Sequence, residues 1–182
     1  RGYTYDLRNQ ELTLWAGGES SESEIPAPRL THYPTFDSID GEPRLIRAFV
    51  YPGVGEGPHP VVINIHGAPE AQARLRTGQG PTEKAGITLI TPNVRGSTGY
   101  GRTYTTLDDW YLREDAVRDI GVLLDWIAEQ PDMDGTRVAV MGGSYGGYMT
   151  NWAMGQTNEF ACAITDRCVS NIVSMAGSSD FP

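Results

Sequence analysis

Short runs of aliphatic, often β-branched residues constrain the fold of this chain more than any other feature. They are VVINI at 61–65, ITLIT at 87–91, RVAVM at 137–141 and ACAIT at 161–165. Short continuous apolar runs are typical of strands that are covered on both faces, as in parallel sheets flanked by helices. RLIRAFVYP at 44–52 alternates instead, which predicts a strand with one solvated face.

Helical patterns separate these runs. Between residues 114 and 130 the apolar side chains fall on one helical face, with Gly121 among them and charged residues opposite: Val117, Ile120, Leu124 and Ile127. Pro131 and Gly135 end that helix, and residues 144–155 can form another one despite their glycines. Strands that alternate with helices predict an α/β fold with a mostly parallel sheet.

The N-terminal part has a different pattern. Residues 1–18 alternate around Arg8-Asn9-Gln10, which predicts a hairpin, and a hairpin alone is marginal in water, so we expect it to belong to a larger sheet. Residues 19–30, ESSESEIPAPRL, are rich in Ser, Glu and Pro, which indicates a linker. We place the linker at residues 19–34 and the main domain at residues 35–182.

Composition excludes several classes of partner. With 14 Lys and Arg against 23 Asp and Glu, the net charge is -9, so we expect no nucleic-acid or membrane partner. No apolar run approaches the roughly 20 residues that cross a bilayer. Cys162 and Cys168 fit no disulfide, zinc or redox pattern, so we expect buried thiols in a reducing, cytoplasmic compartment. We also expect no metal and no cofactor, because His, Cys and carboxylate residues do not cluster at ligand spacing.

The segment Gly142-Gly143-Ser144-Tyr145-Gly146 matches the G-x-S-x-G pattern between a strand and a helix. Small residues around the serine let the backbone turn sharply, so that the hydroxyl is held above the sheet. This predicts Ser144 as a nucleophile. It also predicts the N–H of Tyr145, at a helix N-terminus, as a donor to the oxyanion. The alternative is a glycine-rich turn in which Ser144 is an ordinary N-cap.

A nucleophilic serine needs a base, usually a histidine held by a carboxylate. The three histidines, His32, His59 and His66, all precede Ser144, whereas hydrolases with this turn have the order Ser, Asp or Glu, His. The base is therefore outside this chain, or the order is unusual. We expect His66 to fix a loop by hydrogen bonds rather than to act as the base, and His32 and His59 to be exposed loop residues.

Two further loops follow predicted strands. In Gly67-Ala68-Pro69 we predict the N–H of Ala68 as the second oxyanion donor, with an ordinary turn as the alternative. Asp166 follows another strand, and we expect a salt bridge, for example with Arg167, rather than a catalytic acid. The glycine-rich residues 93–101, NVRGSTGYG, lack the Lys-Ser/Thr pair of a phosphate loop, so we expect no nucleotide site there.

Five segments together resemble the catalytic domain of the prolyl oligopeptidase family, in its acylaminoacyl-peptidase and dipeptidyl-peptidase-like branch. They are INIHGAPEAQ, NVRGSTGYG, LREDAVRDIGVLLDWIAEQ, VAVMGGSYGGYMTNWAMGQ and AITDRCVSN, within a similarity that spans residues 35–181. The resemblance implies an α/β-hydrolase fold, incomplete at the C-terminus, preceded by a β-propeller. Residues 1–18 would then be the end of its last blade.

The same resemblance implies site residues. Ser144 is the expected nucleophile, and the N–H groups of Tyr145 and Ala68 are the expected oxyanion hole, although the family usually has glycine where Ala68 stands. The segment CVSNIVSM corresponds to part of the wall of an apolar substrate pocket, which implies the residues Val169, Ile172 and Met175. The triad Asp and His of the family correspond to positions after Pro182, so we expect a truncated protein that is nearly inactive alone.

The predicted function is that of a serine peptidase that hydrolyses short peptides through an acyl-enzyme on Ser144. Two alternatives stay open. An esterase or lipase can have the same fold and the same turn, and a non-catalytic binding module can retain the turn without a base. The residues leave open the choice among acylaminoacyl-, dipeptidyl- and endopeptidase activity, and the oligomeric state.

Overall fold

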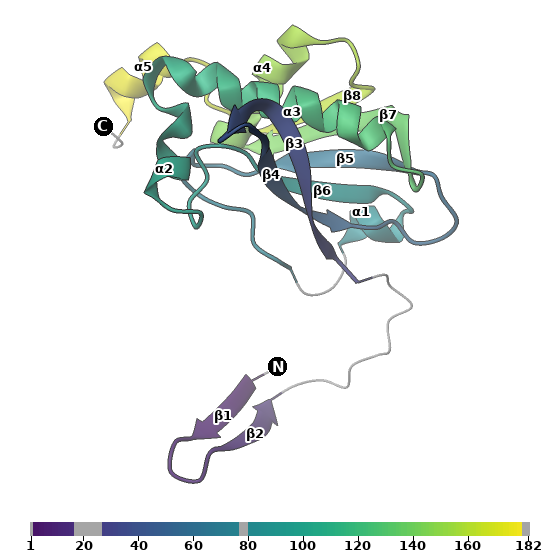
Figure 1. Ribbon diagram of the computed structural model, residues 1–182, viewed down its shortest axis with the longest axis vertical. Coiled ribbons are helices and arrows are strands. Elements are labelled where there is room, and N and C mark those ends of the chain that lie inside the picture. Colours follow the sequence, from purple (N-terminus) through teal and green to yellow (C-terminus); the bar gives the residue numbers. More distant parts are fainter. Residues whose placement is uncertain (1, 17–26, 77–79, 180–182) are drawn as a thin grey trace.

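The computed structural model describes residues 2–16, 27–76 and 80–179, which form two sheets (Figure 1). Strands β1 (Gly2–Asp6) and β2 (Glu11–Ala16) pair antiparallel around a turn in which Gln10 has a φ of 59°. The predicted N-terminal hairpin is therefore confirmed. It forms a two-stranded sheet of its own.

The main sheet has six strands in the order β3-β4-β6-β5-β7-β8. The first two pairings, β3 with β4 and β4 with β6, are antiparallel, and the other three are parallel. The sheet confirms the predicted α/β class with a mostly parallel sheet. Its strands are β3 (Arg29–Ile39), β4 (Glu42–Tyr51), β5 (His59–Ile65), β6 (Thr88–Asn93), β7 (Met133–Gly143) and β8 (Cys162–Asp166).

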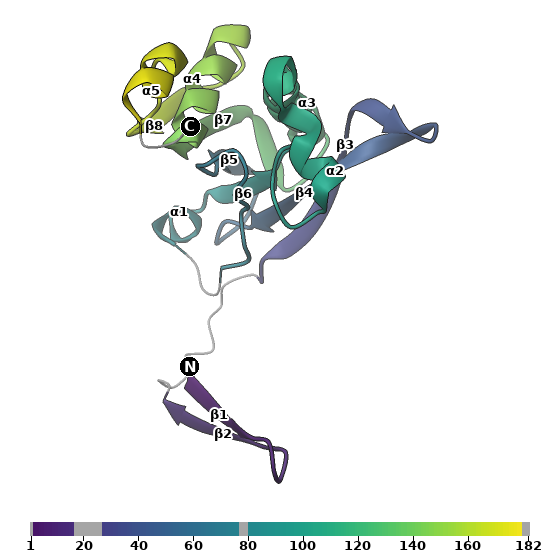
Figure 2. The same cartoon turned by 90° about the vertical axis from the view of Figure 1, so that its left-hand side faces the viewer.

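Helices cover both faces of this sheet. The long helices α3 and α4 contact each other and cover one face, while α1 lies on the other (Figures 1 and 2). Right-handed connections explain this, because the chain moves from β5 to β6 in one direction and from β6 to β7 in the other. The helices are α1 (Pro81–Lys84), α2 (Arg102–Thr105), α3 (Arg113–Ala128), α4 (Tyr145–Gln156) and α5 (Ile172–Ser178).

The core lies between the sheet and helix α3. The predicted apolar face of α3 is buried, with Ile120 and Ile127 fully so, against central strand residues such as Ile63 and Val140. The expectation that charged residues lie only on the opposite face is wrong at Asp119, which is fully buried. Asp119 lies on the inner face, where hydrogen bonds to a buried arginine replace its contacts with water.

The predicted linker extends too far toward the C-terminus. Residues 29–34, which we expected in the linker, belong to β3, and Thr31 of this strand lies opposite Ala48 of β4. Burial alternates through Pro34, which is exposed between the buried Tyr33 and Thr35, but a proline within the segment argues against a strand when only the sequence is read, and pairing with β4 defines this edge strand. Residues 17–26 of the expected hairpin end and linker lie outside the described residues.

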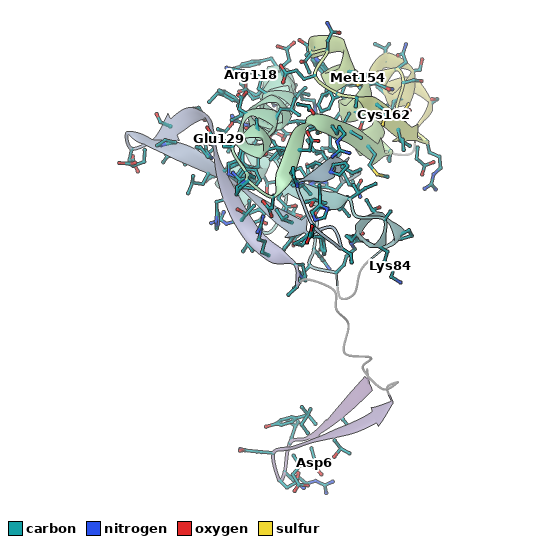
Figure 3. The ribbon with its side chains drawn as sticks, turned by 90° about the vertical axis from the view of Figure 1, so that its right-hand side faces the viewer. Asp6, Lys84, Arg118, Glu129, Met154 and Cys162 are labelled. Carbon is teal, nitrogen blue, oxygen red and sulfur yellow. The ribbon has the colours of Figure 1, made fainter. Side chains whose placement is uncertain are left out.

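The expectation that both cysteines are buried is wrong. Cys162 is exposed on β8, at the outside of the molecule in Figure 3, and Cys168 is half-buried. Strand β8 is the outermost strand of the sheet as described, and it pairs there with β7 alone, so all five of its residues are exposed. In the described part of the chain, no helix combines the length and apolar character that a membrane span requires.

Candidate active site

Ser144 is the single residue between strand β7 and helix α4. Its backbone has φ 56° and ψ −122°, a conformation that residues with a Cβ rarely adopt. Strain of this kind amounts to about 1–3 kcal/mol and is found mainly at functional sites. The side chain is exposed and makes no capping hydrogen bond, so the alternative of an ordinary N-cap does not describe this turn.

Glycines let two backbone segments approach closely around Ser144. A Cβ on Gly146 would overlap the carbonyl oxygen of Ile65, and one on Gly142 would overlap the carbonyl group of Gly146. On Gly67 it would lie 2.9 Å from the Gly143 oxygen. Strands β5 and β7 are paired with Ile65 opposite Gly142, so the loop after β5 lies directly against the turn after β7.

The two predicted oxyanion donors lie on these two segments. Tyr145 is the first residue of α4, and Ala68 follows Gly67 with a φ of 48°. Among the described residues, neither N–H donates a hydrogen bond. A left-handed conformation favours glycine, so Ala68 carries strain that a glycine would not. The site therefore has two backbone donors available for an anion, one on each side of the place where the two loops meet.

His66 makes no hydrogen bond with Ser144 among the described residues. Its Nδ1 lies 3.1 Å from the Gly67 carbonyl oxygen, and its Nε2 lies 2.9 Å from Ser97 Oγ. Burial lowers the pKa of His66, and the hydrogen bond to Gly67 offsets this only in part, so the ring is neutral at pH 7. These contacts match the expectation of a histidine that fixes a loop.

The other two histidines differ from their predictions. His59 is not an exposed loop residue: it is the first residue of β5, is 8% exposed, and its Nδ1 lies 2.9 Å from the Gly86 carbonyl oxygen. His32 is exposed as predicted, but it lies in strand β3 rather than in a loop. Both predictions relied on neighbouring prolines and glycines, which here flank or interrupt strands instead of excluding them.

Asp166 ends strand β8 beside the turn. Its backbone carbonyl accepts the N–H of Ser144 at 2.9 Å, so β8 helps to hold the strained residue. Its side chain accepts hydrogen bonds from Arg167 at 2.8 and 3.1 Å, which confirms the expected salt bridge. The same hydrogen bonds lower the pKa of this exposed carboxyl.

The phenol of Tyr145 has partners that the sequence did not reveal. Arg113, at the start of α3, donates a hydrogen bond of 2.9 Å to its hydroxyl, and Asp108 lies 3.8 Å from the same guanidinium. Burial raises the pKa of Asp108 to about 6 against the lowering effect of Arg113. Asp108 and Asp109 adjoin the apolar residues that precede the helix, but no spacing rule connects them to Tyr145.

The predicted pocket residues are only partly brought to the turn. The N–H of Val169 donates to the Ser144 carbonyl at 3.4 Å. Its side chain helps to line a cavity of about 410 Å³ with Tyr148, Asn151, Trp152 and Ser170. Ile172 and Met175 lie on α5, the former 44% exposed and the latter half-buried. That α5 is a helix, capped by the Asn171 side chain, was not predicted.

The glycine-rich loop 93–101 is built around a buried ion pair. Arg95 is 3% exposed and donates to both carboxylate oxygens of Asp119, at 2.8 and 3.0 Å, and to Asp37 at 3.0 Å. The sequence contained one cue to this ion pair, which is the position of Asp119. It lies three residues after Ala116 and four before Leu123, so it shares one face of the helix with these apolar residues. Among the residues that the structure describes, no group of His, Cys, Asp and Glu could hold a metal ion.

Known proteins resemble this chain in sequence. The sequence matches the prolyl oligopeptidase family over residues 74–182. It is 33% identical over 185 residues to the uncharacterized peptidase YuxL of Bacillus subtilis, and this alignment covers 98% of this chain and 28% of that protein. It is 32% identical over 126 residues to the acylamino-acid-releasing enzyme of Rattus norvegicus, and this alignment covers 68% of this chain and 17% of that enzyme.

Solved structures agree with these sequence matches. A Mycobacterium tuberculosis puromycin-hydrolyzing peptidase superposes with a TM-score of 0.73 at 26% identity, over 97% of this chain and 28% of that one. The described fold is therefore that of the α/β-hydrolase peptidases. The chain spans less than a third of the length of each of these relatives.

Proposed function

The chain belongs to the prolyl oligopeptidase family, and from this premise we propose that Ser144 is the nucleophile of a serine peptidase that acts on short peptides. The observation that carries the proposal is the backbone of Ser144, which is strained at φ 56° while its side chain stays exposed, together with the N–H groups of Tyr145 and Ala68, which have no partner among the described residues. A structural serine would not need this combination of strain, exposure and free donors.

In the proposed reaction, Ser144 Oγ attacks the scissile carbonyl carbon and forms a tetrahedral intermediate. The negative oxygen accepts hydrogen bonds from the N–H groups of Tyr145 and Ala68, and the N-terminus of α4 adds a favourable dipole. Collapse of the intermediate expels the amine and leaves an acyl group on Ser144, which water then hydrolyses. Loss of one oxyanion donor typically lowers kcat by about 10²–10³-fold.

A base must take the proton of Ser144. None of the three histidines makes a hydrogen bond with Ser144 in the described part of the chain. We therefore assign the base and its carboxylate partner to parts of the protein beyond these 182 residues. The chain by itself then keeps only the oxyanion hole and substrate binding, which leave about 10³–10⁴-fold catalysis over water in triad enzymes that lack a member.

The substrate side chain before the scissile bond would bind next to Val169, with Ile172 and Met175 as further apolar walls. Val169 supports this part because its backbone is hydrogen-bonded to Ser144. In the same proposal, residues 29–182, which begin with strand β3, are the N-terminal part of the peptidase domain, and residues 1–18 are the end of a propeller blade. We also propose a cytoplasmic location for the protein.

The test uses the full-length protein that contains this chain, with peptide p-nitroanilides and p-nitrophenyl esters as substrates. We expect hydrolysis of the peptides, and a loss of at least about 10⁴-fold in kcat for Ser144→Ala. Ser38→Ala, which removes another exposed serine, is the matched control and should leave kcat unchanged. Hydrolysis of esters alone would favour an esterase, and peptide binding without turnover would favour a binding module.

A further inference from the structure

We propose that His66 is a positioning residue that orients the N–H of Ala68 through the carbonyl group of Gly67. The inference rests on the function proposed above, in which this N–H binds the oxyanion. Among the described residues His66 makes no hydrogen bond with Ser144, and the proposed mechanism gives it no contact with the substrate, so its effect on the reaction is indirect.

One peptide group connects Gly67 with Ala68. The carbonyl oxygen of Gly67 and the N–H of Ala68 belong to the same planar unit, and in a trans peptide they point in opposite directions. His66 Nδ1 lies 3.1 Å from that oxygen. A proton on Nδ1 that is donated to the oxygen fixes the plane of the unit, so the N–H must point away from the imidazole ring.

Among the described residues, His66 is the hydrogen-bond partner of the peptide group between Gly67 and Ala68. Ala68 is exposed and has a φ of 48°, and its N–H has no partner among the described residues. The preceding residue is a glycine, whose backbone rotates more freely than that of any other residue. Rotation of the peptide plane would turn the N–H away, and the bond from His66 opposes this rotation. It also polarises the unit, which makes the N–H a stronger donor.

The imidazole ring itself is held by the rigid part of the molecule. Its Nε2 lies 2.9 Å from the hydroxyl of Ser97, which is fully buried and also lies 2.6 Å from the Val94 carbonyl oxygen. A neutral ring carries one proton, which the proposal places on Nδ1, so Nε2 accepts the hydroxyl proton of Ser97 and this proton is then not donated to Val94. Ser97 follows Arg95, whose guanidinium is bound by Asp119. A buried ion pair therefore anchors the loop that fixes the histidine, and the histidine fixes the peptide.

The peptide that His66 orients lies next to the candidate nucleophile. A Cβ on Gly67 would lie 3.3 Å from the Cβ of Ser144 and 2.9 Å from the carbonyl oxygen of Gly143. Loop and turn are thus in backbone contact, and a change in the direction of the Ala68 N–H changes the place where a negative oxygen can be bound.

Two polar substitutions separate the two hydrogen bonds of the ring. His66→Asn places an amide N–H near the position of Nδ1 and can still donate to Gly67, whereas His66→Gln places it near Nε2 and can reach only Ser97. In the full-length protein, we expect His66→Gln and His66→Leu to lower kcat by about 10–100-fold, less than loss of a donor, with KM nearly unchanged. His66→Asn should stay within about threefold of the natural protein in kcat.

Equal losses for His66→Asn and His66→Gln, or a change in KM alone, would overturn the inference. Ser144→Ala, measured in parallel, tests the proposed function separately. If the natural protein hydrolyses no substrate, the proposed function fails, and the role of His66 is then decided by the measurement that follows.

The ¹⁵N resonance of an amide responds to a hydrogen bond on the preceding carbonyl, so Ala68 reports on His66 without any catalysis. In the ¹⁵N-alanine-labelled chain, with Ala68→Ser to assign the signal, His66→Leu and His66→Gln should move the Ala68 resonance and His66→Asn should largely keep it. Asn and Leu both lack the aromatic ring, so the difference between them reports the hydrogen bond. An Ala68 resonance that is the same in the Leu and Asn variants would refute the proposal.

Discussion

Two glycine-rich loops follow the carboxyl ends of parallel strands in this sheet, and they differ in whether their polar groups are paired. After β6, Arg95 is 3% exposed and every hydrogen bond it makes goes to a carboxylate. After β7, Ser144 is exposed and strained, and the next N–H has no partner in the described part of the chain. The first loop holds the scaffold, and the second presents groups that can react.

The loop after β6 shows how a buried charge is made tolerable. Burial by itself would lower the pKa of Arg95, but the hydrogen bonds and charge of Asp119 outweigh this and raise it. The centroid of the Phe36 ring lies 4.3 Å from the guanidinium carbon of Arg95 and 3.5 Å from that of Arg118. Because the charges are paired so completely, removal of a buried partner should lower the free energy of unfolding far more than a substitution of similar size in the turn at Ser144.

The largest expected effect therefore comes from breaking this pairing. Asp119→Leu leaves the Arg95 guanidinium buried with only Asp37 and Asp115 near it, and should lower the free energy of unfolding by about 3–5 kcal/mol. Urea unfolding measures the change. Asp37→Asn, which removes a more exposed partner of the same guanidinium, is the matched control and should lower it by less than about 1 kcal/mol. Equal effects would mean that burial does not decide the strength of this cluster.

A second prediction concerns Asp108, which lies between the two loops. Its carboxylate packs against Gly96 of the first loop, and it pairs at 3.8 Å with Arg113, which binds Tyr145 of the second. Burial raises its pKa to about 6 from 3.8, so the folded state binds a proton more readily than the unfolded chain. The resulting stabilisation is present below about pH 4 and is lost as the pH rises through about 6.

Asp108→Asn should remove that pH dependence. We expect the variant to be more stable than the natural chain above pH 6, by about 1–2 kcal/mol, and the difference to shrink as the pH falls toward 4. Unfolding in urea between pH 4 and 8 gives both curves. Asp109→Asn, which removes the adjacent and less buried carboxylate, serves as the control for the loss of one negative charge in this segment. Parallel curves for Asp108→Asn and the natural chain would contradict the prediction.

The smallest expected effect tests strain in the loop that carries the oxyanion donor. Ala68→Gly relieves a left-handed backbone, worth about 1–2 kcal/mol, but adds freedom to the unfolded chain, worth about 0.4–1 kcal/mol. The net change should be a stabilisation of at most about 1.6 kcal/mol. Ala161→Gly, at an exposed residue without a left-handed φ, should instead destabilise by about 0.4–1 kcal/mol. The same sign for both variants would exclude strain at Ala68.

Sequence patterns predicted the parts of the fold that depend on local backbone preference. The continuous apolar runs became β5, β6 and β7, and the periodic segment became α3, because side-chain spacing alone specifies which face can be buried. The same reasoning missed β3, which contains Pro34, and misjudged His59, because the pairing of the one and the burial of the other depend on segments that are distant in the sequence.

The candidate site shows the same division. The order strand, Gly-Gly-Ser-Tyr-Gly, helix was enough to predict a sharp turn at Ser144, because only small residues permit it. That the turn meets the loop of Ala68 follows from the parallel register of β5 with β7, in which Ile65 lies opposite Gly142. That Ser97 supports His66 follows from the parallel pairing of β5 with β6. Local sequence determines which backbone shapes are allowed, whereas long-range packing decides which of their polar groups find partners and which remain free to react.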